Sequence, residues 1–217
     1  MERAFVSEKK NSGFSIIELI TVIAIMAVMF GIGVYTFAML SGAEAKQGAR
    51  KTEACLNDIK TGAMSRAGEY MIIRYIEVTD AGKDALAKAG ITKSGYYAEK
   101  RATTITNASN IVVDYSTDAE YTLIGTGKIA IIVNGGTFTL SKEAGVSNAL
   151  RIEYNRGNGT FKKVSTGSVS GTGLADTFAE GATIELEKLE FQALTGRGTH
   201  YVIDFDAVTS KHTVTAI

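Results

Sequence analysis

The sequence predicts an α+β protein in which one long N-terminal α-helix packs on a C-terminal antiparallel β-sheet. Three observations support this fold class. An apolar run extends from Phe14 to Leu40, and its only charged residue is Glu18. A segment with helical periodicity follows it as far as Tyr70. After Met71 the pattern changes to short runs rich in β-branched and aromatic residues, separated by Gly, Asn and Asp.

Composition limits the class of protein. The chain has 217 residues, enough for one globular domain plus an extended element or for two small domains. Lys and Arg together number 23, and so do Asp and Glu, so no bulk positive charge points to nucleic-acid binding. Cys55 is the single cysteine, which excludes an intrachain disulfide and makes a small buried thiol the expected state of that side chain.

The run from Phe14 to Leu40 is long enough to cross a membrane. As an α-helix it would extend about 40 Å, compared with about 30 Å for the hydrocarbon core of a bilayer. A cleaved secretory signal peptide has a shorter apolar core of about 7–15 residues, so we do not expect this class. An unpaired ionised side chain is costly in a bilayer, and its presence usually marks function. We therefore expect Glu18 to have a specific role.

The helix is expected to continue beyond the apolar run. From Ser41 onward, small and apolar residues recur at spacings of three and four, with charged residues between them. The residues of this stripe are Ala45, Ala49, Leu56, Ile59, Ala63, Ala67 and Tyr70. We therefore expect one helix from about Ser15 to near Tyr70, with its second half against a globular body.

Two turn sequences predict β-hairpins in that body. Asn134-Gly135-Gly136 and Arg156-Gly157-Asn158-Gly159 each lie between β-rich runs, and such residues favour tight turns. The β-rich runs are residues 111–115, 121–124, 129–133, 137–140, 150–155 and 160–164.

The remaining body is expected to contain a short helix, a loop and a meander. The short helix is predicted around Lys83–Ala89, and Val164–Gly181, rich in Ser, Gly and Thr, is predicted to be a surface loop. Residues 183–194, 200–206 and 211–217 predict an antiparallel meander at the C-terminal end.

The N-terminal motif resembles that of type IV prepilins and type II secretion pseudopilins. Lys9-Lys10-Asn11-Ser12-Gly13 stands directly before Phe14-Ser15-Ile16-Ile17-Glu18 and the rest of the apolar run. Glycine, an aromatic residue and glutamate therefore occur at fixed offsets beside a membrane-length helix. The resemblance implies that a membrane-embedded prepilin peptidase cuts between Gly13 and Phe14 and methylates the new N-terminal amine of Phe14.

The resemblance also implies a role for Glu18 in assembly. Processed subunits of this family leave the bilayer and pack their helices in the core of a filament, where the amine of Phe14 is a buried positive charge. A buried charge needs a partner. We expect Glu18 of an adjacent subunit to provide it and thereby to set the axial offset between neighbours.

These expectations divide the chain into four segments. Residues 1–13 are the cytoplasmic leader peptide, which is removed, and its basic residues agree with a cytoplasmic location. Residues 14–40 are the transmembrane and filament-core helix, and residues 41–75 its amphipathic continuation. Residues 76–217 are a β-rich extracytoplasmic globular domain. A long helix packed on an antiparallel sheet is also the pilin-like fold that the resemblance implies.

No catalytic site is predicted. The sequence has no Gly-x-Ser-x-Gly, His-Glu-x-x-His or Cys-x-x-Cys motif and no glycine-rich loop with complete dinucleotide or phosphate-binding spacing. The two histidines, His200 and His212, occur near Asp204 and Asp206, and a hairpin could place them face to face as zinc ligands. We expect them instead to be polar residues on an exposed strand face, with no metal and no cofactor.

The sequence therefore predicts a structural subunit rather than an enzyme. The expected partners are prepilin peptidase, other pilin or pseudopilin subunits and an assembly platform in the inner or cytoplasmic membrane, with no nucleic-acid partner. The expected location is the cytoplasmic membrane, as a single-pass protein, and then a filament at the cell surface or in the periplasm. Two alternatives stay open: a pseudopilin of a type II secretion or DNA-uptake machine, and a single-pass membrane-anchored enzyme or binding protein.

Overall fold

The structure is a computed structural model of the chain, which divides into two compact units, residues 1–38 and 39–217. The side chains of residues 33–41 are outside its described part. The described residues are 15–65, 69–102, 104–105, 111–112, 119–140, 146–170, 177–194, 199–206 and 208–217.

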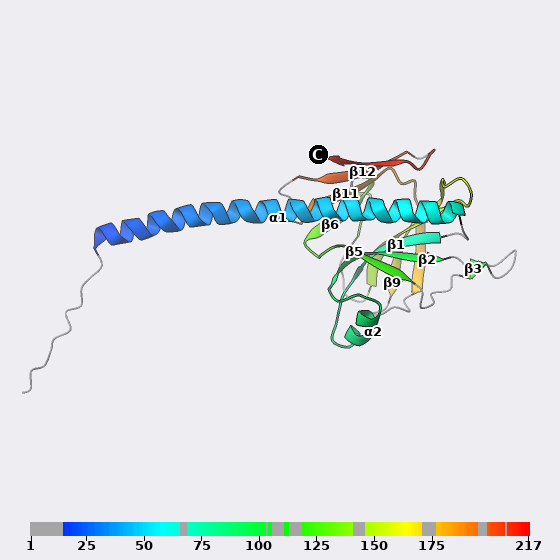
Figure 1. Ribbon diagram of the computed structural model, residues 1–217, viewed down its shortest axis with the longest axis horizontal. Coiled ribbons are helices and arrows are strands. Elements are labelled where there is room, and N and C mark those ends of the chain that lie inside the picture. The colour runs from blue at the N-terminus through cyan, green and yellow to red at the C-terminus, as the bar shows by residue number, and fades with distance from the viewer. Residues whose placement is uncertain are drawn as a thin grey trace, which may run out of the picture. The chain divides into compact units, whose positions relative to one another are not determined.

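Helix α1 (Ile16–Ser65) is the longest element (Figure 1). No proline interrupts it. In the second unit it buries Ala45, Ala49, Leu56, Ile59 and Ala63, each 0% exposed, at spacings of three, four and seven. They are five of the seven residues in the predicted stripe; Ala67 lies outside the described residues, and Tyr70 lies in a strand.

Strand β1 (Glu69–Ile76) begins where the sequence analysis still expected helix. The assignment of residues up to 75 to the helix is therefore wrong from residue 69 onward. Successive side chains of a strand point to opposite faces of its sheet. Met71 and Ile73 join the main core, while Tyr70 and Ile72 join a smaller cluster. The run is apolar on both faces, and a helical stripe and a fully buried strand are hard to distinguish in such a run.

Two antiparallel sheets form the body (Figure 1). The strands of the six-stranded sheet, in spatial order, are β10 (Thr177–Thr183), β9 (Phe161–Ser170), β8 (Val146–Tyr154), β1, β2 (Gly95–Ala102) and β5 (Glu120–Gly125). Those of the five-stranded sheet are β13 (His212–Ala216), β12 (Tyr201–Phe205), β11 (Lys188–Ala193), β6 (Ile129–Val133) and β7 (Phe138–Thr139). The predicted α+β class with antiparallel sheet is confirmed.

Four short elements complete the described fold. Helix α2 (Lys83–Lys88) lies where a short helix is predicted. The 3₁₀ turn η1 (Asn134–Gly136) connects β6 and β7. Strands β3 (Thr104–Ile105) and β4 (Ile111–Val112) pair only with each other.

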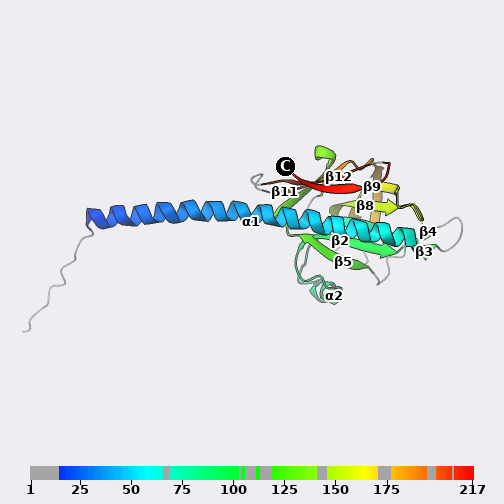
Figure 2. The same cartoon turned by 45° about the horizontal axis from the view of Figure 1, so that its top comes forward.

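One main core joins α1 to both sheets. Its buried side chains come from the second half of α1, from β1, β2, β5, β8 and β9 of one sheet, and from β6, β11 and β12 of the other. Figures 1 and 2 show this part of α1 running alongside both sheets. Gly48 permits the close approach, because an added Cβ would lie 3.3 Å from Ile129 and 3.4 Å from Phe191. The helix is thus the element on which both sheets pack.

The predicted hairpin turns are confirmed. In the β8–β9 hairpin, Asn155 N–H donates to Thr160 O at 2.7 Å, and Gly159 N–H donates to Asn155 O at 3.1 Å. Gly159 has a φ of +64°, and a Cβ there would lie 2.9 Å from Met64 Sδ of α1. Only glycine satisfies both the backbone conformation and the contact with the helix.

The predicted surface loop Val164–Gly181 is wrong. Strand β9 continues to Ser170 and β10 runs from Thr177 to Thr183, while residues 171–176 lie outside the described part. Glycine at position 167 allows β9 and β10 to pair here, because an added Cβ would collide with the ring of Phe178. Composition alone indicated a loop, because Ser and Gly are poor strand formers until a neighbouring strand supplies packing.

We predict that Leu56→Ala destabilises the body. Leu56 is 0% exposed, so truncation leaves a cavity and should lower the free energy of unfolding by about 2–5 kcal/mol. Urea unfolding of the detergent-solubilised chain, followed by tyrosine fluorescence and circular dichroism, measures this. The matched control is Asn57→Ala at the adjacent exposed position, which should change stability by less than about 0.5 kcal/mol. Equal effects of the two substitutions would show that α1 does not bury this stripe.

Candidate functional site: the start of helix α1

Glu18 caps the first turn of α1. Its Oε2 accepts a hydrogen bond from Ser15 N–H at 3.1 Å, and Ser15 Oγ accepts one from Ile17 N–H at 3.3 Å. Ser15 O accepts from Leu19 N–H at 3.1 Å and so starts the helical hydrogen bonds. The bond from Ser15 N–H to Glu18 is the one that a capping box requires, whereas Ser15 Oγ accepts from Ile17 N–H instead of from Glu18 N–H. The free N–H groups of a first helical turn are thereby partly satisfied.

A sequence signal for this cap is present, although the cap is not among the features predicted above. Ser15-Ile16-Ile17-Glu18 has the S-x-x-E spacing of a capping box directly before an apolar run. The negative charge of Glu18 also lies at the positive end of the helix dipole. Within the described residues the carboxylate makes no other hydrogen bond or ion pair, so Oε1 is available to a partner.

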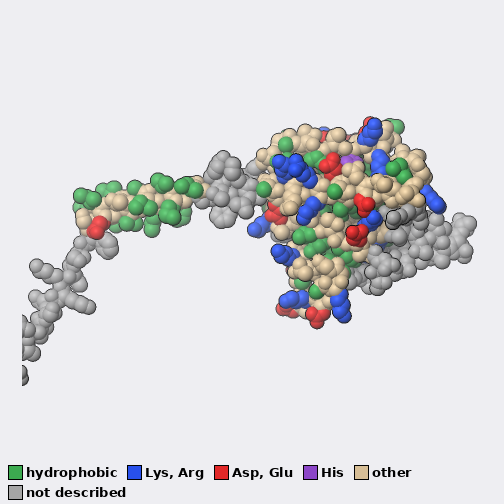
Figure 3. All heavy atoms as spheres, viewed as in Figure 1, with side chains coloured by type: hydrophobic (Ala, Val, Ile, Leu, Met, Phe, Trp, Pro, Cys, Tyr) green, Lys and Arg blue, Asp and Glu red, His purple; other side chains and the backbone are tan. Residues whose placement is uncertain are grey.

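Apolar side chains surround the helix in the first unit. Every described residue from Ser15 to Ile32 is exposed. Even the least exposed of the large apolar side chains, Val22, is 47% exposed, and Ile16 is 77% exposed. Figure 3 shows these side chains covering the visible face of the helix. A helix that is hydrophobic on all sides needs to be buried in other apolar material.

The predicted membrane span is a separate question from the exposed apolar surface. Within the described residues, none of the helices combines the length and the hydropathy that a membrane span requires. The predicted span from Phe14 to Leu40 starts at a residue outside the described part and includes undescribed side chains from 33 onward. The span therefore stays a prediction.

The predicted processing residues Gly13 and Phe14 also lie outside the described residues. The structure places Ser15, the residue after Phe14, at the N-terminal cap of α1. The third predicted site residue, Glu18, is described and points back to this cap.

A comparison with protein families identifies the N-terminal segment. Residues 9–34 match the prokaryotic N-terminal methylation motif, the signal of type IV prepilins and pseudopilins. The chain therefore carries the N-terminal signal of a type IV pilin-like or pseudopilin-like precursor. The matched segment includes Gly13, Phe14 and Glu18 and ends well before the β-rich body. No curated protein and no solved structure matches the chain.

The two histidines do not face each other. In the β12–β13 pair, Phe205 lies opposite His212, whereas Tyr201 lies opposite Ala216. His200, just before Tyr201, is therefore at the other end of the pair, where its Nδ1 lies 3.1 Å from Glu190 Oε1. The alternative in which a hairpin brings both histidines together is wrong, because the register separates them. The expectation that both are on an exposed strand face is also wrong for His212, whose ring nitrogens are buried. No group of three or more metal-ligating side chains occurs among the described residues.

Cys55 is half-buried on α1. Burial raises the pKa of its thiol, and the carboxylates of Asp58 and Glu120 act in the same direction, while a hydrogen bond with Thr122 opposes them. A raised pKa keeps the group as a thiol rather than the more reactive thiolate. The predicted role of Cys55 as a small packed side chain agrees with this.

The β1–β2 pair contains a buried ion cluster that sequence reasoning did not find. Arg74 Nε donates to Glu99 Oε2 at 3.0 Å, Arg101 donates to Glu99 Oε1, and Tyr121 O–H donates to Glu99 Oε1 at 3.2 Å. The side chains of Arg74 and Glu99 are 3% and 1% exposed. Both carboxylate oxygens accept hydrogen bonds from these donors, so we assign the cluster to the structure of the sheet and not to catalysis.

We predict that Ser15→Ala frays the start of α1. Losing the Oγ acceptor removes a cap that is typically worth about 0.5–2 kcal/mol, so amide exchange in the first turn should accelerate by roughly 2- to 30-fold. Hydrogen exchange of the unassembled chain in detergent measures this. Thr21→Ala is the control, because its hydroxyl only donates back to Ile17 O at 2.8 Å. Identical exchange in Ser15→Ala and wild type would exclude the cap.

We predict that His212 lowers stability in acid. Both of its ring nitrogens are buried, and burial lowers the pKa of His212 from 6.5. Backbone groups of Ser210 and Glu53 and the carboxylate of Glu53 raise this pKa and Lys60 lowers it, but burial is the largest effect. The folded state therefore resists protonation. The contribution of neutral His212 to the free energy of unfolding is complete above pH 6.5, which is the pKa of this side chain in the unfolded chain. The contribution is lost as the pH falls from 6.5 through the lowered pKa of the folded state.

Urea unfolding between pH 7.5 and 5 tests this. His212→Gln should lose less stability than wild type over this interval. Parallel pH curves for wild type and His212→Gln would contradict the assignment.

Proposed function

We propose that this chain is a prepilin that is cut between Gly13 and Phe14, methylated at the Phe14 amine and assembled into a type IV pilus or pilus-like filament. The observation that carries the proposal is the apolar surface around α1 from Ile16 to Ile32, with Glu18 as its single charge. The methylation motif over residues 9–34 supports the processing step. The predicted partners are prepilin peptidase, other pilin subunits and a membrane assembly platform.

Burial of the helix is the proposed driving force. Full burial of one large aliphatic side chain is worth about 1.5–3 kcal/mol. The described part of the first unit exposes eleven large aliphatic side chains and one phenylalanine. We propose that residues Phe14 to Leu40 lie in the cytoplasmic membrane before assembly and among neighbouring α1 helices afterwards. Either environment removes this surface from water.

Glu18 is proposed to fix the offset between subunits. Its Oε2 is used by the cap of its own helix, and its Oε1 is left for the amine of Phe14 in an adjacent subunit. Removing one partner of a buried ion pair costs about 3–5 kcal/mol, because the remaining charge is uncompensated. Cap and inter-subunit pair use different oxygens of one carboxylate, so they are compatible.

Two other functions are distinguished by specific observations. A pseudopilin of a type II secretion or DNA-uptake machine has the same N-terminal motif, and the host's filament length and dependence on that machine separate it from a pilin. A membrane-anchored enzyme or binding protein needs no processing at Gly13. Mass spectrometry of the native N-terminus tests the latter, with methylated Phe14 expected and intact Met1 as the contrary result.

We predict that Glu18→Gln abolishes assembly while processing continues. The amide oxygen of glutamine still accepts the hydrogen bond from Ser15 N–H, but the charge that pairs with the Phe14 amine is lost. Filament yield, from sheared and sedimented material, should fall more than tenfold. Ser15→Ala is the matched control, because it weakens the cap and retains the charge. Wild-type filament yield from Glu18→Gln would remove the proposed pairing.

A further inference from the structure

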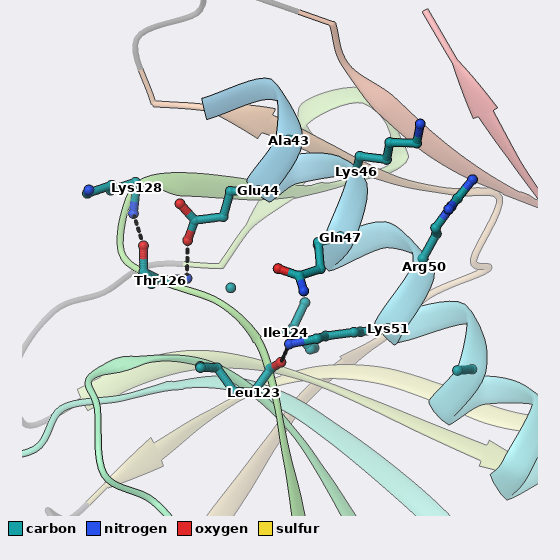
Figure 4. Close-up of a pocket in the computed structure, with 12 residues that line it drawn as sticks. Ala43, Glu44, Lys46, Gln47, Arg50, Lys51, Leu123, Ile124, Thr126 and Lys128 are labelled. Carbon is teal, nitrogen blue, oxygen red and sulfur yellow. Dashed lines mark hydrogen bonds between the residues drawn. The ribbon is translucent and has the colours of Figure 1, made fainter. Parts of the chain in front are cut away.

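A groove between α1 and the connection from β5 to β6 has a basic rim (Figure 4). It has a volume of about 810 Å³ and lies entirely within the second unit. We call it the basic groove; its charged lining residues are Glu44, Lys46, Arg50, Lys51 and Lys128. Four cations thus stand against one carboxylate, in a chain whose formal net charge is zero.

Two of these charged residues, Glu44 and Lys51, make hydrogen bonds across the groove. Glu44 Oε1 accepts from Thr126 N–H at 2.7 Å, and Lys51 Nζ donates to Leu123 O at 2.9 Å. The first bond connects α1 to Thr126 of the β5–β6 connection, and the second connects α1 to strand β5, as Figure 4 shows. Gln47 also points toward that connection in the close-up. These contacts fix the distance between helix and connection.

The other three cations have no partner among the described residues. Lys46, Arg50 and Lys128 are exposed, and none of them makes a side-chain hydrogen bond or ion pair within the described residues. In Figure 4 Lys46 and Arg50 extend from α1 away from the Leu123 side, and Lys128 extends outward from the connection. Three unpaired cations around one groove form a surface for an anionic partner.

An acidic loop lies elsewhere on the same body. Glu185 and Glu187 are exposed, while Leu186 between them is 1% exposed and anchors the loop. Neither carboxylate makes an ion pair within the part of the chain described. The nearby Lys162 and Lys163 are already paired, with Glu153 at 2.6 Å and Glu180 at 2.7 Å.

Asn134 fixes the backbone of this acidic loop. Its Nδ2 donates to Glu185 O at 2.6 Å, and its Oδ1 accepts from Glu187 N–H at 2.9 Å and Lys188 N–H at 3.1 Å. These three hydrogen bonds fix the conformation of the loop. Both charged surfaces are preorganised, which lowers the entropic cost of binding.

Strand register places the two surfaces at opposite ends of one strand pair. In the β6–β11 pair, Ile129 lies opposite Ala193 and Val133 lies opposite Leu189. Lys128 directly precedes the first end, and Glu187 comes one residue before β11 at the other. Six to seven residues at about 3.4 Å each separate the ends by roughly 20 Å. The body is thus positive at one end of these strands and negative at the other.

We propose that the acidic loop Glu185–Glu187 of one subunit binds at the basic groove of the next copy of this chain. The inference rests on the proposed filament function. A contact between two different surfaces of identical chains is heterologous and can repeat without closing, as a filament requires. A two-fold contact through the basic groove would instead bring like charges together. Complementary charge mainly gives such a contact its register and specificity.

Disulfide trapping in filaments tests the contact directly. In a Cys55→Ser background, Lys128→Cys and Glu187→Cys are combined in one chain. Because about 20 Å of sheet separates the two positions within a subunit, a disulfide between them has to be intermolecular. The expected result is a ladder of covalent oligomers after mild oxidation of filaments. The control pair Lys88→Cys with Glu187→Cys, which moves one cysteine to α2, should give no ladder.

Charge reversal provides the second arm. Lys46→Glu with Arg50→Glu should lower filament yield at least about fivefold, and adding Glu185→Lys with Glu187→Lys should restore it. Reversal of Lys83 and Lys88 on α2 is the control and should have little effect. Loss without restoration would assign the groove to another anion, such as a lipid headgroup, and would overturn the proposal.

The two proposals fail in different ways. If wild type forms filaments and the cysteine pair gives no ladder, only the head-to-tail contact is wrong. If wild type keeps residues 1–13 and forms no filaments, the proposed function itself is wrong.

Discussion

The exposed apolar surface of α1 is the constraint on which the rest of the structure depends. From Ile16 to Ile32 large apolar side chains are on every face of the helix, so no single packing partner within the chain can cover it. Burial of such a surface requires lipid or several neighbouring helices. Glu18 is the one charge in this surface, and its carboxylate both caps the helix and leaves one oxygen for another molecule.

The second half of α1 packs in a different way from the first half. Here one stripe is apolar and small, and Gly48, Ala45 and Ala49 allow the helix to approach both sheets closely. The opposite side carries Lys46 and Arg50, which are exposed. One continuous helix thus combines a surface suited to assembly with a surface that organises the body.

The charged surfaces of the body lie at opposite ends of one strand pair, and the overall composition does not reveal them. The formal net charge of zero conceals a positive groove at one end of the β6–β11 pair and a negative loop at the other. Each is held by a side chain that bonds backbone groups, Glu44 at the groove and Asn134 at the loop. Such polarity suits a subunit that repeats in one direction.

The sequence by itself determined the long helix, the antiparallel character of the body, the two hairpin turns and the methylation motif around Gly13, Phe14 and Glu18. These features depend on local periodicity, turn residues or fixed spacing, which are legible without contacts. The tertiary structure decided the rest. The helix ends before Tyr70 and Val164–Gly181 is largely strand, because neighbouring strands stabilise residues whose own preferences are weak. The separation of His200 from His212 and the opposition of the basic groove to the acidic loop follow from strand register, which no single segment encodes.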